Sequence, residues 1–318
     1  MKNGSILVSA PGKIHLLGEH SVVYGKPALL AAINKRLAVK ITPSVAHTGF
    51  VLEGNKKSLL PFQKIIENTI KETYKIKKIP PYSATITSTI PLGFGLGSSA
   101  ALSATVTASL LSFLNIPWDK KSVFSISYLG EKHFHGNPSG GDLATTIEGG
   151  LLYFRKEFEF LKSFSPLPFS PTIKDFLLID SGKPLESTKE MVTKVANLKK
   201  SFPKKVDEIF SNQEQLTKDL VLALQENDSK TVISVLQLGE KNLEKLDVVS
   251  KKSQGIIRAI EKLKGAGKIS GAGGFKNGSG MLLAYHTDPE VLLKFAKTNN
   301  LVAEKITIEN TGLIVRDK

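Results

Sequence analysis

A glycine-rich stretch at residues 91–101, Pro-Leu-Gly-Phe-Gly-Leu-Gly-Ser-Ser-Ala-Ala, has the composition of an anion site built from backbone groups. Its glycines let main-chain N–H groups approach a bulky anion without interference from Cβ atoms. Ser98 and Ser99 follow where a helix should begin, and apolar residues then recur at helical spacing. Because a helix N-terminus attracts anions, the stretch predicts a phosphate site.

This stretch differs from the two familiar glycine loops. It lacks the lysine of a P-loop and the last glycine spacing of a dinucleotide-binding fingerprint. The alternative interpretation is a glycine-rich turn that only lets the helix pack against a strand.

A second motif, Ala-Pro-Gly-Lys at residues 10–13, follows a predicted first strand. A lysine just after a Pro-Gly turn at a strand end would project from a rigid base, where it could neutralise a phosphate or a developing alkoxide. Read alone, Lys13 could equally be a solvated surface lysine. His20, in the Gly-Glu-His-Ser segment at residues 18–21, could equally be a structural histidine.

Two carboxylates eleven positions apart, Glu131 and Asp142, flank a polar turn that contains Gly-Asn-Pro-Ser-Gly-Gly. Such a pair could divide the work of a phosphotransferase, one carboxylate holding Mg²⁺ and the other facing the substrate hydroxyl. The alternative for Asp142 is the N-cap of a helix predicted from Leu143.

A last glycine cluster spans residues 269–280 between two predicted strands. It could close over an active site from a second domain, or it could be a flexible hairpin tip.

The composition of the chain predicts the class of protein that carries these motifs. A chain of 318 residues with 41% hydrophobic and 23% charged residues predicts a globular protein of two domains that share a cleft. There is no cysteine and no signal-peptide core, so we expect a cytoplasmic protein. The net charge of +14 is spread over both halves rather than gathered in a stripe, which argues against nucleic acid as a partner. The uncharged run at residues 79–118 is broken by prolines and glycines, which argues against a membrane span.

Periodicity predicts a mixed α/β first half and a helix-rich second half. The expected strands cover residues 6–9, 37–41, 83–89, 150–154, 176–179, 268–270, 280–285, 303–308 and 313–316. The expected helices cover residues 60–75, 98–114, 122–134, 187–196, 203–225, 229–246, 253–263 and 289–298.

Three motifs in this order, Pro-Gly-Lys at 11–13, Gly-Leu-Gly-Ser-Ser-Ala at 95–100 and Gly-Ala-Gly-Gly at 271–274, resemble those of the GHMP kinase superfamily. Within it the sequence is most similar to the mevalonate kinases, through residues 18–28, 131–142 and 180–192. The resemblance implies an α+β fold, with an N-terminal domain like domain 2 of ribosomal protein S5 over residues 1–180 and a ferredoxin-like domain over residues 181–318.

The resemblance also implies roles for individual residues in an ATP- and Mg²⁺-dependent phosphorylation of the 5-hydroxyl of mevalonate, a step of isoprenoid precursor synthesis. Asp142 would be the catalytic base, or at least orient the hydroxyl, and Lys13 would favour the alkoxide. Glu131 and Ser99 would share Mg²⁺. Glu19, His20 and Thr188 would line the mevalonate pocket, with His20 as donor to the substrate carboxylate. The ATP phosphates would lie in a loop made of Gly93, Gly95, Leu96, Gly97, Ser98, Ser99 and Ala100.

Two departures from the family pattern leave alternatives open. Gly141 stands where mevalonate kinases usually have an aliphatic residue, and residues 271–280 form a bulkier, charged version of the last glycine loop. Phosphomevalonate kinase or another small-molecule GHMP kinase is therefore one alternative, and an inactive nucleotide-binding sensor is a more distant one. We expect a small-molecule substrate and neither nucleic acid nor membrane as partner; the oligomeric state stays open, with a homodimer as one alternative.

Overall fold

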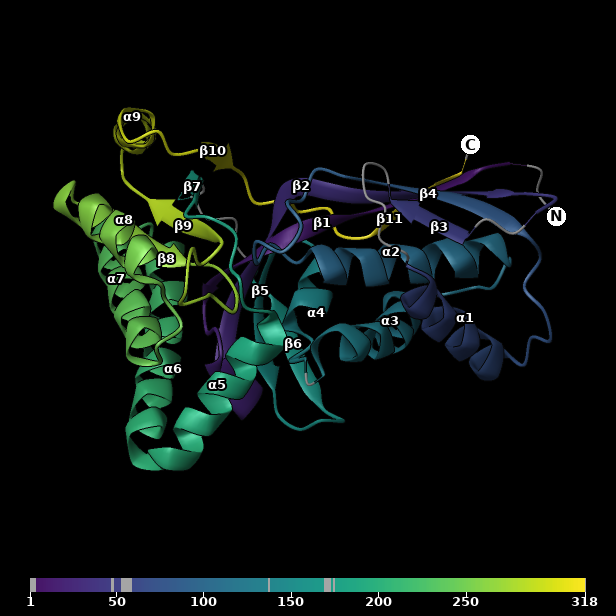
Figure 1. Ribbon diagram of the computed structural model, residues 1–318, viewed down its shortest axis with the longest axis horizontal. Coiled ribbons are helices and arrows are strands. Elements are labelled where there is room, and N and C mark those ends of the chain that lie inside the picture. Colours follow the sequence, from purple (N-terminus) through teal and green to yellow (C-terminus); the bar gives the residue numbers. More distant parts are fainter. Residues whose placement is uncertain are drawn as a thin grey trace.

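The computed structural model describes residues 4–317 apart from 47–48, 53–58, 137, 169–172 and 174. Its elements form two sheets, each covered by helices (Figure 1). The first sheet contains seven strands: β1 (Ile6–Leu17), β2 (Pro27–Pro43), β3 (Gly49–Leu52), β4 (Tyr82–Ser88), β5 (Leu151–Lys156), β6 (Lys162–Pro166) and β11 (Ile314–Asp317).

Helices cover one face of this first sheet. In Figure 1 α2 lies directly beneath the strands, with α1 and α3 beyond it. These helices are α1 (Leu60–Tyr74), α2 (Ser98–Phe113), α3 (Lys120–His135) and α4 (Gly141–Glu148), and a 3₁₀ turn, η1 (Ser21–Tyr24), joins β1 to β2. Helix α2 is buried along most of its length, because small residues such as Ala100 and Ala104 let it lie close to the sheet.

The second sheet is antiparallel and has the order β10-β7-β9-β8. Its strands are β7 (Phe176–Asp180), β8 (Ala266–Ile269), β9 (Met281–Tyr285) and β10 (Ala303–Ile306), and its helices are α5 (Thr188–Ser201), α6 (Pro203–Glu226), α7 (Ser229–Lys245), α8 (Lys251–Lys262) and α9 (Pro289–Thr298). Successive residues of β7 belong to different hydrophobic clusters, Leu178 to one and Leu177 to the other. The sheet is therefore covered on both faces, which explains its continuous apolar strands.

The chain passes between the two sheets near its predicted domain boundary and again near its end. β7, which ends at Asp180, pairs with strands of the second sheet, whereas β11 returns to pair with β1 of the first. Arg36 in β2 helps hold this return, because its guanidinium donates to the carbonyls of Ser9, Thr311 and Gly312. The division between residues 180 and 181 stays a prediction.

The expectation that the first strand ends at a Pro-Gly turn is wrong. β1 continues through Pro11 and Gly12 to Leu17, paired with β2, and a register shift between Pro11 and Gly12 replaces the turn. Such a bulge accommodates a proline, which has no N–H to donate to a ladder. Lys13 thus projects from the interior of a strand and not from a strand end.

Most of the other predicted elements are confirmed, and the α+β class with them. β2 is much longer than the predicted strand at 37–41, because its first half reads Ala-Leu-Leu-Ala-Ala-Ile, a run in which periodicity cannot separate strand from helix. β3 and β6 were not predicted from the sequence. Within the described residues, no helix has both the length and the apolar character that crossing a membrane requires.

A buried ion pair joins the two sheets. Lys268 of β8 donates to Glu19, which follows β1, and both side chains are almost completely buried. Lys268 also donates to the carbonyl of His15 at 3.2 Å. This lysine therefore links the second sheet to the segment after the first strand.

Removing one partner of this pair should destabilise the fold, because it leaves the other charge buried and uncompensated. We expect Lys268→Met to lower the free energy of unfolding by about 3 kcal/mol, measured by urea denaturation. The double variant Lys268→Met/Glu19→Gln should recover part of the loss. The matched control is Lys305→Met, which breaks an exposed pair with Glu290 and should change stability little. A Lys268→Met protein as stable as the unmodified chain would contradict this account.

Candidate active site

The predicted glycine loop connects β4 to α2. Gly93, Gly95 and Gly97 all have left-handed backbone angles, with φ of 82°, 84° and 75°. Gly97 is the N-cap of α2, and no side chain caps this helix end. The first N–H groups of α2 are thus available for an anion, as the sequence predicted.

Two of these glycines are required by packing as well as by backbone conformation. A Cβ on Gly95 would lie 2.2 Å from the carbonyl oxygen of Ser270, and one on Gly97 would lie 2.7 Å from Cγ of Lys13. The loop is therefore enclosed between β1 and the segment after β8. The alternative of a purely local helix-packing turn does not account for these distant contacts.

Lys13 is buried at the centre of the site. Its Nζ lies 3.1 Å from Oδ2 of Asp142, 3.0 Å from the carbonyl oxygen of Gly95 and 2.9 Å from Nδ1 of His15. Its backbone N–H donates to the carbonyl of Leu96 at 3.0 Å. Lys13 is not the solvated surface lysine of the alternative interpretation; it holds the glycine loop and Asp142 together.

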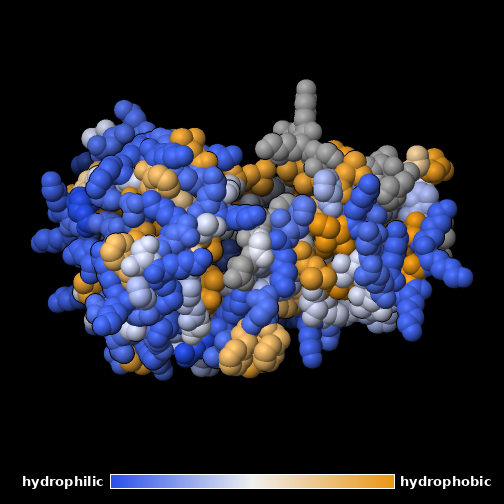
Figure 2. Space-filling view, turned by 60° about the horizontal axis from the view of Figure 1, so that its bottom comes forward, coloured by the Kyte–Doolittle hydropathy of each residue, from blue (hydrophilic) through white to orange (hydrophobic). Residues whose placement is uncertain are grey.

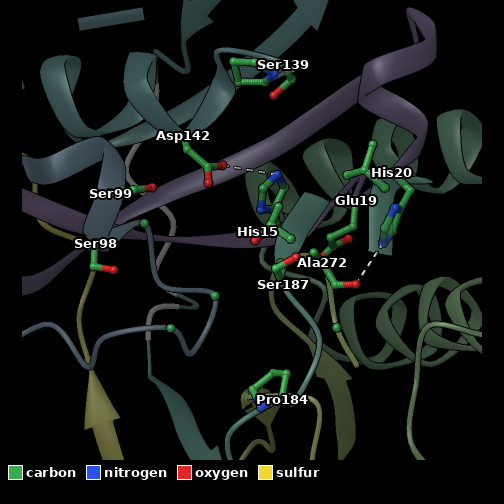
Figure 3. A pocket seen from close by; sticks show the side chains of 18 of the residues that line it. His15, Glu19, His20, Ser98, Ser99, Ser139, Asp142, Pro184, Ser187 and Ala272 are labelled. Carbon is green, nitrogen blue, oxygen red and sulfur yellow. Dashed lines mark hydrogen bonds and ion pairs between the residues drawn. The ribbon is translucent and has the colours of Figure 1, made fainter. Parts of the chain in front are cut away.

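Asp142 lies in the first turn of α4 and faces the same space as Ser99 of α2 (Figure 3). The N-cap of α4 is Gly140, at a φ of 94°, so the alternative of Asp142 as N-cap is wrong. The carboxylate is about a third exposed while its lysine partner is buried. Asp142 can therefore meet both Lys13 and a molecule in the cavity.

Glu131 comes from the last part of α3 and points at α2. Its carboxylate accepts from the hydroxyl of Ser103 at 3.1 Å and from that of Ser99 at 3.4 Å. Burial, and then the nearby charge of Asp142, raise the pKa of Glu131 to about 8. A buried carboxylate with hydroxyl neighbours at the wall of the cavity suits a divalent metal ion, which would stabilise its charged form.

The described residues contain no cluster of three or more acidic, histidine or cysteine side chains that would form a metal cage by themselves. Mg²⁺ commonly binds to one or two carboxylates together with substrate phosphates. Glu131 and Ser99, next to the glycine loop, fit this kind of site.

Glu19 and His20 both line the cavity, but both are already engaged. Glu19 pairs with Lys268, and burial raises its pKa. His20 Nε2 lies 3.1 Å from the carbonyl oxygen of Ala272, which can only accept, so Nε2 carries the proton. Burial lowers the pKa of His20 to about 4, so the ring is neutral near pH 7.

One cavity of about 520 Å³ brings most of the predicted residues together. It opens where the surface is hollowed between the two parts of the molecule (Figure 2). Thr188, at the first position of α5, lines it, as do residues 271–273 of the last glycine loop. Leu96 and Ala100 are fully buried, so only their backbone could serve a ligand.

Two basic residues of the cavity, His15 and Lys183, were not predicted as site residues. His15 lies beside Lys13 and Asp142, and its signal in the sequence was the alternation of Lys13 and His15 along a strand, which places them on one face. Lys183 follows β7, with Nζ 3.6 Å from where a Cβ of Gly93 would be. It has no described hydrogen-bond or ion-pair partner, and no sequence pattern distinguished it.

The comparisons with known proteins agree with this geometry. The sequence pattern of the GHMP kinases N terminal domain matches residues 62–150. A mevalonate kinase of Archaeoglobus fulgidus is 31% identical over 274 residues, covering 85% of this chain and 89% of that protein. The chain belongs to the GHMP kinase superfamily and, within it, to the mevalonate kinase family. It is thus an ATP-dependent small-molecule kinase.

Further relatives of this kinase extend the match. A mevalonate kinase of Schizosaccharomyces pombe is 30% identical and covers 85% of this chain and 81% of its own. The structure of L. major mevalonate kinase in complex with R-mevalonate has a TM-score of 0.78 at 19% identity, with 96% of each chain covered. Streptococcus pneumoniae phosphomevalonate kinase has a TM-score of 0.75 at 20% identity, covering 95% and 99%. The GHMP kinase fold is confirmed, and the fold alone does not select the substrate.

The raised pKa of Glu131 has a consequence for stability. The folded-state pKa of about 8 lies above the value of this carboxyl in the unfolded chain, so the unfolded state loses the Glu131 proton at a lower pH than the folded state does. The folded kinase without metal should therefore lose stability as pH rises from about 4.5 to about 8. We expect Glu131→Gln to raise the melting temperature at pH 8 and to change it little at pH 5, measured by calorimetry without metal or nucleotide.

The same variant should lose the stabilisation that Mg²⁺ adds to bound nucleotide at pH 8. Ser103→Ala, which removes a hydroxyl but no charge, is the control. Equal melting temperatures of the Glu131→Gln and unmodified proteins at pH 8 would count against a charged, desolvated carboxylate.

Proposed function

We propose that this kinase transfers the γ-phosphoryl group of ATP to the 5-hydroxyl of mevalonate, with Mg²⁺ held by Glu131 and Ser99. The observation that supports this most is the meeting of Asp142, Lys13 and the glycine loop in one cavity. Phosphoryl transfer depends mainly on positioning and on neutralising charge at the phosphoryl oxygens, so a lysine, an oriented aspartate and a metal site are a sufficient set.

The glycine loop would hold the ATP phosphates at the uncapped N-terminus of α2. Lys183 would add a positive charge beside this loop, because its Cε and Nζ lie close to where a Cβ of Gly93 would be. Among the described residues that line the cavity, the two lysines are Lys13 and Lys183, and Lys13 is occupied by Asp142. Lys183 is therefore the lysine better placed to meet an incoming triphosphate.

When bound, Mg²⁺ would neutralise the β- and γ-phosphate oxygens. The residues of this chain then have two tasks. Glu131 and the hydroxyl of Ser99 would hold the ion beside the loop, and Asp142 would face the substrate from the neighbouring helix.

At the hydroxyl, Asp142 would act through Oδ1. Its other oxygen, Oδ2, is bound to Lys13 at 3.1 Å, whereas Oδ1 lies 3.7 Å from the nearest His15 nitrogen, beyond hydrogen-bond distance. Oδ1 is thus the atom that can accept a hydrogen bond from the 5-hydroxyl and orient it for in-line attack. An aspartate is a weak base for an alcohol, so proton transfer would come late in the reaction.

His20 was the predicted donor to the mevalonate carboxylate, and this stays a prediction with one condition. The Nε2–H group donates to the carbonyl of Ala272, so His20 can donate to the mevalonate carboxylate only if this hydrogen bond breaks. Thr188, whose hydroxyl stands at the N-terminal end of α5, offers a second donor at the cavity wall.

The charge of the cavity favours mevalonate over its phosphorylated product as substrate. A second phosphate would need several cations around it, yet acidic side chains outnumber the lysines among the described lining residues. The inactive sensor is disfavoured for another reason, since Lys13 and Asp142 are both present and paired.

ATP consumption by the purified kinase with Mg²⁺ tests this proposal, with mevalonate, 5-phosphomevalonate, galactose and homoserine supplied separately. We expect turnover with mevalonate, and NMR of the product should show phosphate on the 5-oxygen. Turnover with 5-phosphomevalonate alone would move the assignment to phosphomevalonate kinase. No turnover with any of the four would overturn the proposal.

Asp142→Asn should lower kcat by about a hundredfold or more, because the amide cannot accept the hydroxyl proton. The dissociation constant of ATP, measured by calorimetry, should change little. Asp228→Asn, at the N-cap of α7 away from the cavity, is the control for loss of an aspartate charge. Undiminished kcat in Asp142→Asn would remove Asp142 from the reaction.

A further inference from the structure

We propose that His15 is a positioning residue that fixes the Lys13–Asp142 pair in its reactive arrangement. The inference rests on the proposed function for its catalytic consequence, but its structural basis stands apart from any substrate. His15 is a buried histidine of β1, and both of its ring nitrogens face the reactive pair.

The first step is the hydrogen bonding of Lys13. A lysine ammonium has three N–H donors and no acceptor. Three acceptors surround Lys13 Nζ: Gly95 O at 3.0 Å, Asp142 Oδ2 at 3.1 Å and His15 Nδ1 at 2.9 Å. All the donors of this buried cation are thus satisfied, and His15 supplies the acceptor that no backbone carbonyl provides.

The second step concerns the tautomer of His15. A nitrogen that accepts from Lys13 cannot carry a proton, so the proton of a neutral ring must be on Nε2. Burial, and then the charge of Lys13, lower the pKa of His15 well below its usual value, which agrees with a neutral ring. The Nε2–H group then faces Asp142, as the broken line in Figure 3 marks.

The third step is what this arrangement does to Asp142. Lys13 binds Oδ2, and the polar Nε2–H of His15 stands 3.7 Å from Oδ1. Lys13, itself positioned by His15, therefore holds the carboxylate at Oδ2, and Oδ1 has a polar neighbour that leaves it able to accept from a molecule in the cavity. An apolar side chain at position 15 would leave one donor of Lys13 without an acceptor and Oδ1 without a polar neighbour.

The backbone of His15 is itself held from the second sheet. Its N–H donates to the hydroxyl of Ser270 at 3.0 Å, and its carbonyl accepts from Lys268 at 3.2 Å. His15 therefore connects the segment that carries the last glycine loop to the pair that would meet the substrate.

The tautomer can be tested without substrate. In protein labelled with ¹⁵N-histidine at pH 7, long-range ¹H–¹⁵N NMR should show His15 with an unprotonated Nδ1 and a protonated Nε2; comparison with His15→Gln assigns the signal. A ring protonated at Nδ1 would overturn the proposal, even if the kinase is fully active on mevalonate. The expected tautomer would support it, even if another substrate proves correct.

A series of variants separates the two contacts of the ring. His15→Leu removes both, His15→Asn keeps an acceptor at the δ position for Lys13, and His15→Gln keeps a donor at the ε position for Asp142. We expect His15→Leu to lower kcat about tenfold or more, since small displacements of reacting groups are costly. The dissociation constant of ATP should stay unchanged, and His15→Asn should restore part of the lost kcat.

A merely structural histidine would give a different pattern. Ile14→Val, at the neighbouring buried position of β1, controls for lost packing and should lower the melting temperature without lowering kcat. The proposal is overturned if His15→Leu retains the kcat of the unmodified kinase on its best substrate. It is also overturned if His15→Asn and His15→Leu are equally impaired, because the acceptor for Lys13 would then have no effect.

Discussion

The arrangement of the site depends on one buried ammonium group, that of Lys13. Placing a charge inside a protein is costly unless hydrogen bonds and an opposite charge compensate it. Here the compensation comes from three separate segments: His15 of β1, Gly95 of the glycine loop and Asp142 of α4. Because the partners lie on β1, the glycine loop and α4, these three segments must come together correctly for the lysine to be satisfied.

The same region is where the two sheets meet. The carbonyl of Ser270 lies so close to Gly95 that a side chain there is excluded, and Lys268 reaches across to Glu19. The glycine loop and the wall of the cavity are thus shaped by contacts from both parts of the chain. The site therefore depends on contacts of the second sheet as well as on the course of β1, which continues past Pro11 and carries Lys13 inwards.

The two carboxylates of the cavity, Glu131 and Asp142, have different electrostatic surroundings. Glu131 is deeply buried, with its pKa raised to about 8, whereas Asp142 is partly exposed and paired with Lys13. A metal ion would stabilise the charge of Glu131, whereas Asp142 has the ammonium group of Lys13 beside it and lines the cavity. This contrast in environment matches a metal ligand next to a group that handles a hydroxyl proton.

The sequence by itself determined the features that depend on local chemistry. Three glycines at alternate positions predicted a loop whose backbone can approach an anion, and α2 begins at Ser98 as expected. The ordered motifs predicted the family and the α+β fold. Each motif is a short run of residue types that can be recognised without knowing which distant segment it meets.

Only the tertiary structure decided what depends on distant partners. It showed that Pro11 and Gly12 lie within a paired strand, because the partner β2 sets that register. It showed that Glu19 is bound to Lys268, that His20 donates its Nε2–H to the carbonyl of Ala272, and that His15 stands beside Lys13 and Asp142. The partners in the first two contacts lie about 250 positions away. Long-range packing chooses which buried donor meets which acceptor, and a single sequence does not contain that pairing.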